Sequence, residues 1–259
     1  MKKVLLISHE ASRTGAPILL LNLLYLLKSK GFDVEVLLRN DGELKEDFEK
    51  LAKTTVLYYN ERTVIQKIKR KLHYILLRRR LINNSKNYDR ILSNTILNAD
   101  LDFFLKLNHN VYTYVHELKL VIDYYTSAKQ LNIVQEHTSL FLYPSEIVKS
   151  TLQEEYGITK KPFNYLPYYI PDVLSHKSEY NSDMRKFYGV DNSKFIIGGM
   201  GAISTRKGVD LFLQTAKNVL LKNADALFFW CGGQEDSIEF NNLRKEIQQE
   251  DLSGKVILV

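Results

Sequence analysis

The chain has 259 residues, of which 45% are hydrophobic and 25% charged, with 36 Lys and Arg against 30 Asp and Glu. These values exclude disordered and collagen-like proteins, and the length predicts about two domains. The only cysteine, Cys231, excludes an internal disulfide bond and a thiol-rich metal site, which is typical of a protein in the reducing cytoplasm.

Short apolar runs alternate with longer segments of helical period in the first two thirds of the chain. The longest apolar run, Ile18–Leu27, contains Asn22 and is too short to span a bilayer. Strands are expected at Lys3–Ser8, Asp33–Leu38, Thr54–Tyr58, Arg90–Ser93, Val111–Val115 and Ser139–Tyr143. Helices are expected near residues 17–30, 62–84, 96–107, 124–136 and 145–155. This alternation predicts βαβ units with a mainly parallel sheet.

A polar segment from Tyr168 to Ser193 interrupts the pattern. The elements expected after it are a short helix at Asp183–Tyr188, strands at Lys194–Gly198, Ala226–Cys231 and Lys255–Val259, and helices at Val209–Leu221 and Ile238–Gln249. We therefore predict an α/β protein of two Rossmann-like domains with parallel sheets. Residues 1–172 form the first domain, 173–192 a linker and 193–259 the second domain. The second domain is expected to be incomplete, with about 70 residues against ~150.

Ligands of open parallel sheets bind at the carboxyl ends of the strands, so the loops there are candidate sites. The first strand leads into Gly15 and Ala16, where backbone N–H groups at a helix N-terminus suit an anion. Pro17 is expected as the first helical residue and Gly31 as the residue just past the helix end. The alternative is a flexible connector with a helix cap at Thr14.

A histidine, His116, follows the predicted strand Val111–Val115. The alternative to a functional role is a hydrogen-bonded histidine in the core. Its place at the exit of a buried strand favours the functional role, because that end of the sheet carries the ligand crevice.

The second domain has its own glycine-rich loop, which contains Gly201 and ends in Arg206 and Lys207 before a helix. Two cations beside a helix N-terminus suit a diphosphate, and the alternative is a solvated turn with incidental charge. After the next strand, Gly232 and Gly233 indicate either close backbone approach to a ligand or a plain tight turn.

A dinucleotide-dependent dehydrogenase is the obvious competitor for such loops. Gly199 and Gly201 begin its glycine fingerprint, but Ser204 stands where the third glycine belongs. The following strand ends in Cys231, with no acidic residue for a ribose. These departures disfavour the dehydrogenase.

The basic charge is concentrated in residues 62–90, which hold ten basic side chains against one acidic, a net of +9. A basic amphipathic helix of this kind suits an anionic membrane surface. The alternative is a core-facing helix with a solvated side. Nucleic acid is not expected as a partner, because no binding motif accompanies the charge. The basic residues proposed for the membrane surface are Lys67, Lys69, Arg70, Lys71, Arg78, Arg79 and Arg80, and the expected apolar face holds Ile65, Ile68, Leu72, Ile75, Leu76 and Ile82.

Several of these motifs, in this order, are similar to those of family 4 glycosyltransferases of the GT-B architecture. They are Thr14-Gly15-Ala16-Pro17, Tyr114-Val115-His116-Glu117, Tyr143-Pro144-Ser145, Gly199-Met200-Gly201 with Arg206-Lys207-Gly208-Val209-Asp210, and Phe229-Trp230-Cys231-Gly232-Gly233. The resemblance covers most of the chain.

The resemblance implies transfer of a sugar from a UDP- or GDP-linked donor, with retention of configuration, to a glycan or lipid-linked acceptor in cell-surface polysaccharide synthesis. No metal or cofactor is expected. Catalytic roles would fall to His116, Arg206 and Lys207. The donor would contact Gly15, Ala16, Gly201, Arg206, Lys207, Gly232 and Gly233. A hexosyltransferase in the cytoplasm, peripheral at the inner face of the cell membrane, is the resulting expectation.

Three departures from the family pattern carry consequences. Ala202 stands where the family often has Arg, the usual Asn-Gly turn is absent from Tyr168–Asp172, and the paired glutamates are not present before Val259. We therefore expect a truncated, inactive piece of the enzyme. The alternative is a non-catalytic peripheral membrane or anion-binding protein on the same fold.

Overall fold

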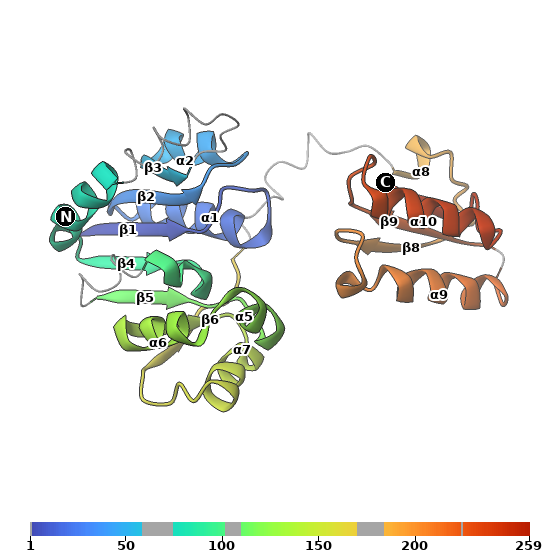
Figure 1. Ribbon diagram of the computed structural model, residues 1–259. Coiled ribbons are helices and arrows are strands. Elements are labelled where there is room, and N and C mark those ends of the chain that lie inside the picture. Colours follow the sequence, from blue (N-terminus) through green and yellow to red (C-terminus); the bar gives the residue numbers. More distant parts are fainter. Residues whose placement is uncertain (1, 59–74, 102–109, 170–183, 224) are drawn as a thin grey trace. The chain divides into compact units, whose positions relative to one another are not determined.

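The computed structural model describes residues 2–58, 75–101, 110–169, 184–223 and 225–259. The chain divides into two compact units, Met1–Val173 (unit 1) and Leu174–Val259 (unit 2). Each contains a parallel sheet with helices, so the expected α/β fold is confirmed (Figure 1).

Unit 1 is built on a seven-stranded sheet in the order β3-β2-β1-β4-β5-β6-β7, in which every neighbouring pair is parallel. Its strands are β1 Lys3–Ser8, β2 Asp33–Asn40, β3 Lys53–Tyr58, β4 Arg90–Ser93, β5 Val111–Tyr114, β6 Thr138–Tyr143 and β7 Phe163–Tyr165. Because β1 pairs with both β2 and β4, the connections from β1 and β4 leave in opposite directions. Such a switch point is where doubly wound sheets bind ligands.

Helices cover both faces of this sheet. Successive β1 side chains point to opposite faces, so Val4 and Leu6 lie in one hydrophobic core while Leu5 and Ile7 lie in the other. The first core is covered by helices α1 and α2, and the second by the helix at 75–84 and helices α5 to α7. The helices of unit 1 are α1 Gly15–Ser29, α2 Lys45–Leu51, 75–84, α5 Lys119–Tyr125, α6 Ala128–His137 and α7 Glu146–Ser150, with 3-10 turns at Ser85–Asn87 and Ile96–Leu101 and a π turn at Thr151–Glu155.

Several helix boundaries differ from the sequence expectation. Helix α1 begins at Gly15, so Pro17 is its third residue and the expected first position was wrong. The helix expected at 124–136 begins only at Ala128, because Ser127 accepts from the Gln130 N–H in a capping box that starts α6. Helix α5, which precedes it, was not expected apart from its last two residues. Gly31 does follow the end of α1, at φ +79°. Residues 62–74 and 102–107 of two expected helices lie outside the described residues.

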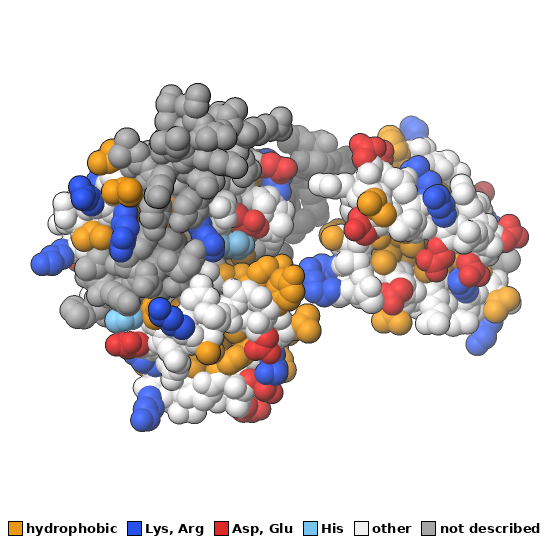
Figure 2. All heavy atoms as spheres, in the orientation of Figure 1, with side chains coloured by type: hydrophobic (Ala, Val, Ile, Leu, Met, Phe, Trp, Pro, Cys, Tyr) orange, Lys and Arg blue, Asp and Glu red, His pale blue; other side chains and the backbone are white. Residues whose placement is uncertain are grey.

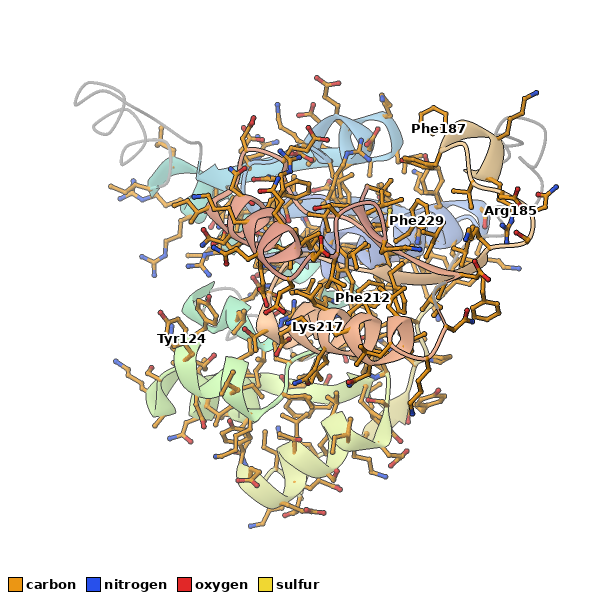
Figure 3. All side chains as sticks on the ribbon, turned by 90° about the vertical axis from the view of Figure 1, so that its right-hand side faces the viewer. Tyr124, Arg185, Phe187, Phe212, Lys217 and Phe229 are labelled. Carbon is orange, nitrogen blue, oxygen red and sulfur yellow. The ribbon has the colours of Figure 1, made fainter. Side chains whose placement is uncertain are left out.

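Unit 2 has a three-stranded parallel sheet in the order β10-β9-β8. Its core holds the rings of Phe228 and Trp230, and the partly buried Phe212 packs against both. Phe229 contacts Tyr188. Figure 3 labels Phe212 and Phe229. The elements are α8 Met184–Phe187, β8 Phe195–Met200, a 3-10 turn at Thr205–Lys207, α9 Val209–Leu220, β9 Ala226–Cys231, α10 Ile238–Gln249 and β10 Val256–Leu258.

A glycine in β8 is required by the packing of the tryptophan. A Cβ atom at Gly199 would lie 2.5 Å from Cε3 of Trp230 and 3.0 Å from the Phe212 ring. The neighbouring Gly198 has open space at the same position. A Cβ atom is therefore accommodated at Gly198 and not at Gly199.

The substitution Gly199→Ala should destabilise unit 2 by about 1–3 kcal/mol, because the added methyl group overpacks the core. Urea unfolding followed by the fluorescence of Trp230, the only tryptophan, measures this loss. Gly198→Ala is the matched control and should not lower stability. Equal destabilisation by both substitutions would contradict the packing argument.

Candidate functional site

Polar side chains gather at the carboxyl ends of β1, β4 and β5. His9 follows β1, Asn94 and Thr95 follow β4, and His116 and Glu117 follow β5. Asn94 and Thr95 are buried, and His116 and His9 are close enough for their charges to interact. The expected residue His116 therefore lies in a polar cluster at the switch point of the sheet.

His116 is held by contacts on its ring and its backbone. The ring Nε2 lies 3.1 Å from Asn94 Oδ1, and the ring packs between Tyr114 and Tyr168, with centroids 4.2 Å and 5.7 Å away. Its Nδ1 atom is buried and has no hydrogen-bond partner among the described residues. Burial lowers the pKa of His116 to about 4, with a further contribution from His9. The imidazole is therefore neutral at pH 7.

Glu117 fixes the backbone at this point of the site. Its Oε2 accepts the His116 backbone N–H at 3.1 Å, and its Oε1 accepts the hydroxyl hydrogen of Thr95. Thr95 Oγ1 also accepts the Leu97 N–H at 3.0 Å. Burial raises the pKa of Glu117, although these hydrogen bonds oppose the shift. Glu117 thus ties the exit of β5 to the loop after β4.

The β1–α1 loop carries its own hydrogen bonds. Glu10 Oε1 accepts from the Ser12 hydroxyl at 2.6 Å and from the Thr14 hydroxyl at 3.3 Å. Thr14 is the N-cap residue of α1 by position, but its side chain makes no capping bond. A Cβ at Gly15 would meet no atom within 4 Å. The first turn of α1 is therefore open beside Gly15.

The cations expected in unit 2 lie on the 3-10 turn before α9. Arg206 and Lys207 are exposed, and no ion pair or hydrogen bond joins their side chains to another described residue. The aliphatic stem of Lys207 passes over Gly201, where a Cβ would lie 3.2 Å from Lys207 Cγ and Cδ. Gly208 follows at φ +73° and is the N-cap of α9. Two unpaired cations thus lie beside a helix N-terminus.

The glycines of unit 2 approach each other closely. A Cβ at Gly232 would lie 2.8 Å from the Gly201 carbonyl oxygen, which already accepts the Trp230 indole N–H at 2.9 Å. A Cβ at Gly233 would lie 2.8 Å from Cδ1 of Ile203. Both residues have φ above +110°. Packing between the two loops is therefore sufficient to require Gly232 and Gly233.

The described part of the basic segment is the helix at 75–84. Arg78, Arg79 and Arg80 are exposed on it. The expected apolar face was wrong in part here. Ile82 does pack against the core, but Leu77 and Leu81 are the buried residues, while Ile75 and Leu76 are 41% and 57% exposed. The remaining expected surface residues, Lys67, Lys69, Arg70 and Lys71, lie outside the described residues.

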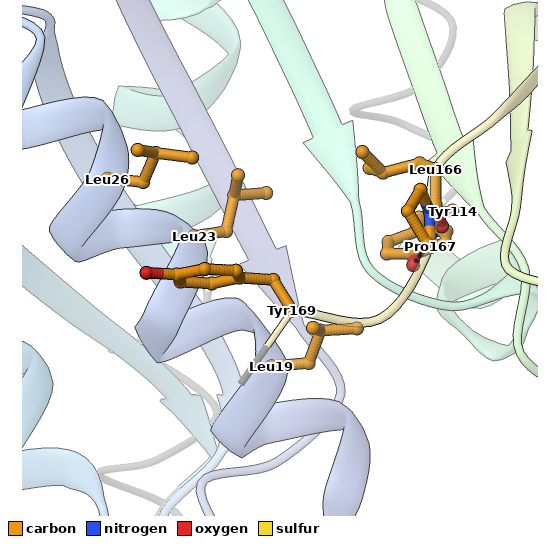
Figure 4. Close-up of a pocket in the computed structure, with 7 residues that line it drawn as sticks. All are labelled: Leu19, Leu23, Leu26, Tyr114, Leu166, Pro167 and Tyr169. Atoms are coloured by element: carbon orange, nitrogen blue, oxygen red, sulfur yellow. Dashed lines mark hydrogen bonds between the residues drawn. The ribbon is translucent and has the colours of Figure 1, made fainter. Parts of the chain in front are cut away.

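An apolar cavity of about 60 Å³ lies beside α1 (Figure 4). The Tyr114 hydroxyl donates to the Leu166 carbonyl at 2.7 Å, and the Asn22 amide lies 3.5 Å from the Tyr169 carbonyl oxygen. The residues that follow β7, up to Tyr169, are thus hydrogen-bonded to both α1 and β5. The cavity is lined by Leu19, Leu23, Leu26, Tyr114, Leu166, Pro167 and Tyr169. Because none of these side chains carries a charge, the polar cluster is the better candidate site.

Helix α5 exposes large apolar side chains directly after Glu117. Leu120 and Tyr124 are each 80% exposed and Tyr125 is 64% exposed. Figure 2 shows hydrophobic side chains at the edge of unit 1 where α5 lies. The polar cluster is thus followed along the chain by an apolar surface.

The expectation from sequence included His116 but omitted its partners Asn94 and Thr95, and it named Glu117 only within the motif Tyr114-Val115-His116-Glu117. A signal for two of them was present, because a polar pair directly follows the predicted strand Arg90–Ser93. Such a pair at the carboxyl end of a buried strand belongs to the ligand edge of the sheet. Within the described residues, no helix is long and apolar enough to cross a membrane.

The chain matches one protein family and is similar to many solved structures. Residues 1–167 match the family described as Glycosyl-transferase family 4. Anabaena HepE in complex with UDP and glucose is 15% identical, with a TM-score of 0.73 over 100% of this chain and 69% of its own. A glycosyltransferase from Rickettsia africae is 14% identical, with a TM-score of 0.64 over 100% and 68%. WaaG, a glycosyltransferase involved in lipopolysaccharide biosynthesis, is 13% identical, with a TM-score of 0.63 over 99% and 69%.

No curated protein matches the sequence. The structural similarities show the fold, and they confirm the expected arrangement of two α/β units with parallel sheets.

The His116 imidazole should titrate with a midpoint near pH 4, because its burial disfavours the charged form. Histidine-selective NMR over a pH series measures this midpoint, and His116→Gln assigns the resonance by removing it. As the pH falls, this histidine takes up a proton in the unfolded chain before it does so in the folded chain. Acidification therefore favours unfolding. Stability should decline as the pH falls from 6.5 towards 4. A midpoint at or above the ordinary value of 6.5 would contradict the buried, neutral imidazole.

Proposed function

Because the chain belongs to glycosyl-transferase family 4, we propose that it acts in transfer of a sugar from a UDP- or GDP-linked donor. The proposal includes retention of configuration and a glycan or lipid-linked acceptor of cell-surface polysaccharide synthesis. The family expected from the motifs is confirmed by the match over residues 1–167. UDP and glucose are bound by HepE, which has the same fold. The expectation that the reaction needs no metal or cofactor stays a prediction.

The observation that carries the proposal is a pair of exposed cations before α9, Arg206 and Lys207, which have no side-chain partner in the described part of the chain. Departure of a nucleoside diphosphate leaves negative charge on the β-phosphate. Preorganised positive groups at that point stabilise the transition state. Arg206 offers a planar fork of donors and Lys207 a point charge, and no carboxylate of the described residues competes for either. We assign these residues to the donor diphosphate.

The polar cluster of unit 1 supports a role in holding the sugar. His116 is neutral at pH 7, so its ring presents an uncharged surface to the sugar and does not attract the diphosphate by charge. The open first turn of α1 at Gly15 and Ala16 adds backbone N–H groups. In this proposal Gly201, Gly232 and Gly233 shape the loops that carry the cations and do not themselves need to touch the donor.

The exposed apolar side chains of α5 support a lipid-linked acceptor. Leu120, Tyr124 and Tyr125 follow His116 by only a few residues. Tyrosine rings combine an apolar body with a polar tip, which suits the boundary between a sugar and its lipid.

Replacement of Lys207 by Ala should weaken the binding of UDP or GDP about tenfold or more, since a charge-assisted contact is lost. Isothermal titration of the chain with UDP, GDP and the matching sugar nucleotides measures this and identifies the base. Lys222→Ala, at an exposed lysine beyond the other end of α9, is the control and should bind as the wild type does. Unchanged affinity in Lys207→Ala would remove Lys207 from the donor site. Failure of the wild type to bind any nucleotide would overturn the proposed donor.

A second proposed activity is binding to an anionic membrane surface through the helix at 75–84. It is supported by Arg78, Arg79 and Arg80, which are exposed on the same helix as the exposed Ile75 and Leu76. Basic and apolar side chains exposed together are what an interfacial helix presents to lipid. This activity fits both the enzyme and the alternative of a non-catalytic peripheral binding protein.

Replacing all three arginines by glutamine should lower binding to anionic vesicles about a hundredfold, at about 1 kcal/mol for each basic residue near the surface. Co-sedimentation with vesicles containing phosphatidylserine, compared with neutral vesicles, measures the effect. The control replaces the exposed Lys28 and Lys30 of the α1 end by glutamine. Equal binding to neutral and anionic vesicles would contradict the proposed binding to an anionic membrane.

A further inference from the structure

Asn94 connects three elements at the carboxyl edge of the unit 1 sheet. It is fully buried, and its backbone N–H donates to the Ile7 carbonyl of β1 at 2.9 Å. Its side-chain amide N–H donates to the carbonyl of Ala16 in the first turn of α1 at 2.7 Å. Its side-chain oxygen lies 3.1 Å from His116 Nε2. One side chain therefore spans the distance between α1 and the exit of β5.

These contacts determine which His116 nitrogen carries the hydrogen. The Ala16 carbonyl can only accept, so Asn94 must turn its NH₂ group towards α1 and its oxygen towards His116. That oxygen can also only accept. The His116 nitrogen facing it must therefore be an N–H donor, which is Nε2. In the neutral ring the lone pair then lies on Nδ1, the buried atom without a partner among the described residues.

No neighbouring carboxylate competes with Asn94 for the ring. Glu117, on the same loop, accepts the backbone N–H of His116. Glu10, in the loop after β1, accepts from Ser12 and lies 3.4 Å from Nε2 of His9. His9, at the end of β1, contributes to the lowered pKa of His116, after the larger effect of burial. Among the described residues, Asn94 is the group that orients the imidazole through a hydrogen bond.

We propose that Asn94 is a positioning residue, which holds His116 in the Nε2–H tautomer and ties the imidazole to the first turn of α1. The use of this arrangement in sugar transfer rests on the proposed function, whereas the tautomer is a property of this chain alone. With Nε2–H engaged by Asn94 and Nδ1 buried, the neutral ring has no N–H left to donate to a phosphate oxygen. Asn94 thereby keeps His116 from binding the diphosphate.

The tautomer is tested directly on the whole chain labelled with ¹⁵N-histidine. Long-range ¹H–¹⁵N spectra at pH 7 should show His116 with a protonated Nε2 and an unprotonated Nδ1. A hydrogen on Nδ1 would overturn the proposal. In Asn94→Ala the Nε2–H should exchange with water at least tenfold faster than in the wild type, because its acceptor is lost. An unchanged exchange rate would also overturn it.

Asn94→Asp supplies a readout that a purely structural role would not move. The carboxylate keeps the shape but adds a negative charge beside the ring, so the pKa of His116 should rise by at least about one unit, a tenfold change in proton affinity. Asn98→Ala is the control, because Asn98 is also buried and bonds to Ile7 but does not touch His116. An unchanged His116 pKa in folded Asn94→Asp, or the same shift in Asn98→Ala, would contradict the proposal.

Nucleotide binding separates this inference from the proposed function. In Asn94→Ala the affinity for UDP or GDP should stay at the wild-type value, because Arg206 and Lys207 are the residues assigned to the diphosphate. A fall in that affinity as large as the fall in Lys207→Ala would contradict the positioning role. If the wild type bound no nucleotide, the donor assignment would fail and the tautomer measurement would still decide the role of Asn94.

Discussion

Unit 1 depends on the burial of β1 between β2 and β4. With neighbours on both edges and helices over both faces, every β1 side chain from Val4 to Ser8 is buried. Such a strand must be apolar on both faces. Because its neighbours run parallel to it, the carboxyl ends of all these strands lie at the same end of the sheet. The chain there can no longer form ladder hydrogen bonds. Side chains satisfy freed backbone groups there: Thr95 accepts the Leu97 N–H and Glu117 accepts the His116 N–H, while Asn94 links α1 to the His116 ring.

The two units offer a ligand different chemistry. In unit 1 the groups at the sheet edge are buried, neutral or hydrogen-bonded to one another, as His116 and Asn94 illustrate. In unit 2 the glycine loops are occupied by packing against each other and against Trp230, and the cations stay in solvent. Unit 1 therefore presents hydrogen-bonding groups in a buried cluster, whereas unit 2 presents charge at its surface.

The fold could be predicted from the sequence to a large extent, because buried parallel strands form short apolar runs with clear ends. Strands Lys3–Ser8, Arg90–Ser93 and Ala226–Cys231 occur with the expected bounds. The break between α5 and α6 could not be predicted from periodicity, because it depends on one capping box at Ser127. His116 could be found by its place after a strand. Its partner Asn94 could not, because their contact joins residues 22 positions apart through the strand order.

The end of the described part of unit 1 has a consequence for the imidazole. Tyr168 stacks on the His116 ring, and the backbone at Leu166 and Tyr169 is bonded to Tyr114 and Asn22. The segment after β7 is therefore held by α1 and β5 and in turn covers the imidazole. The surroundings of His116 thus depend on how this short segment is seated as well as on the strands of the sheet.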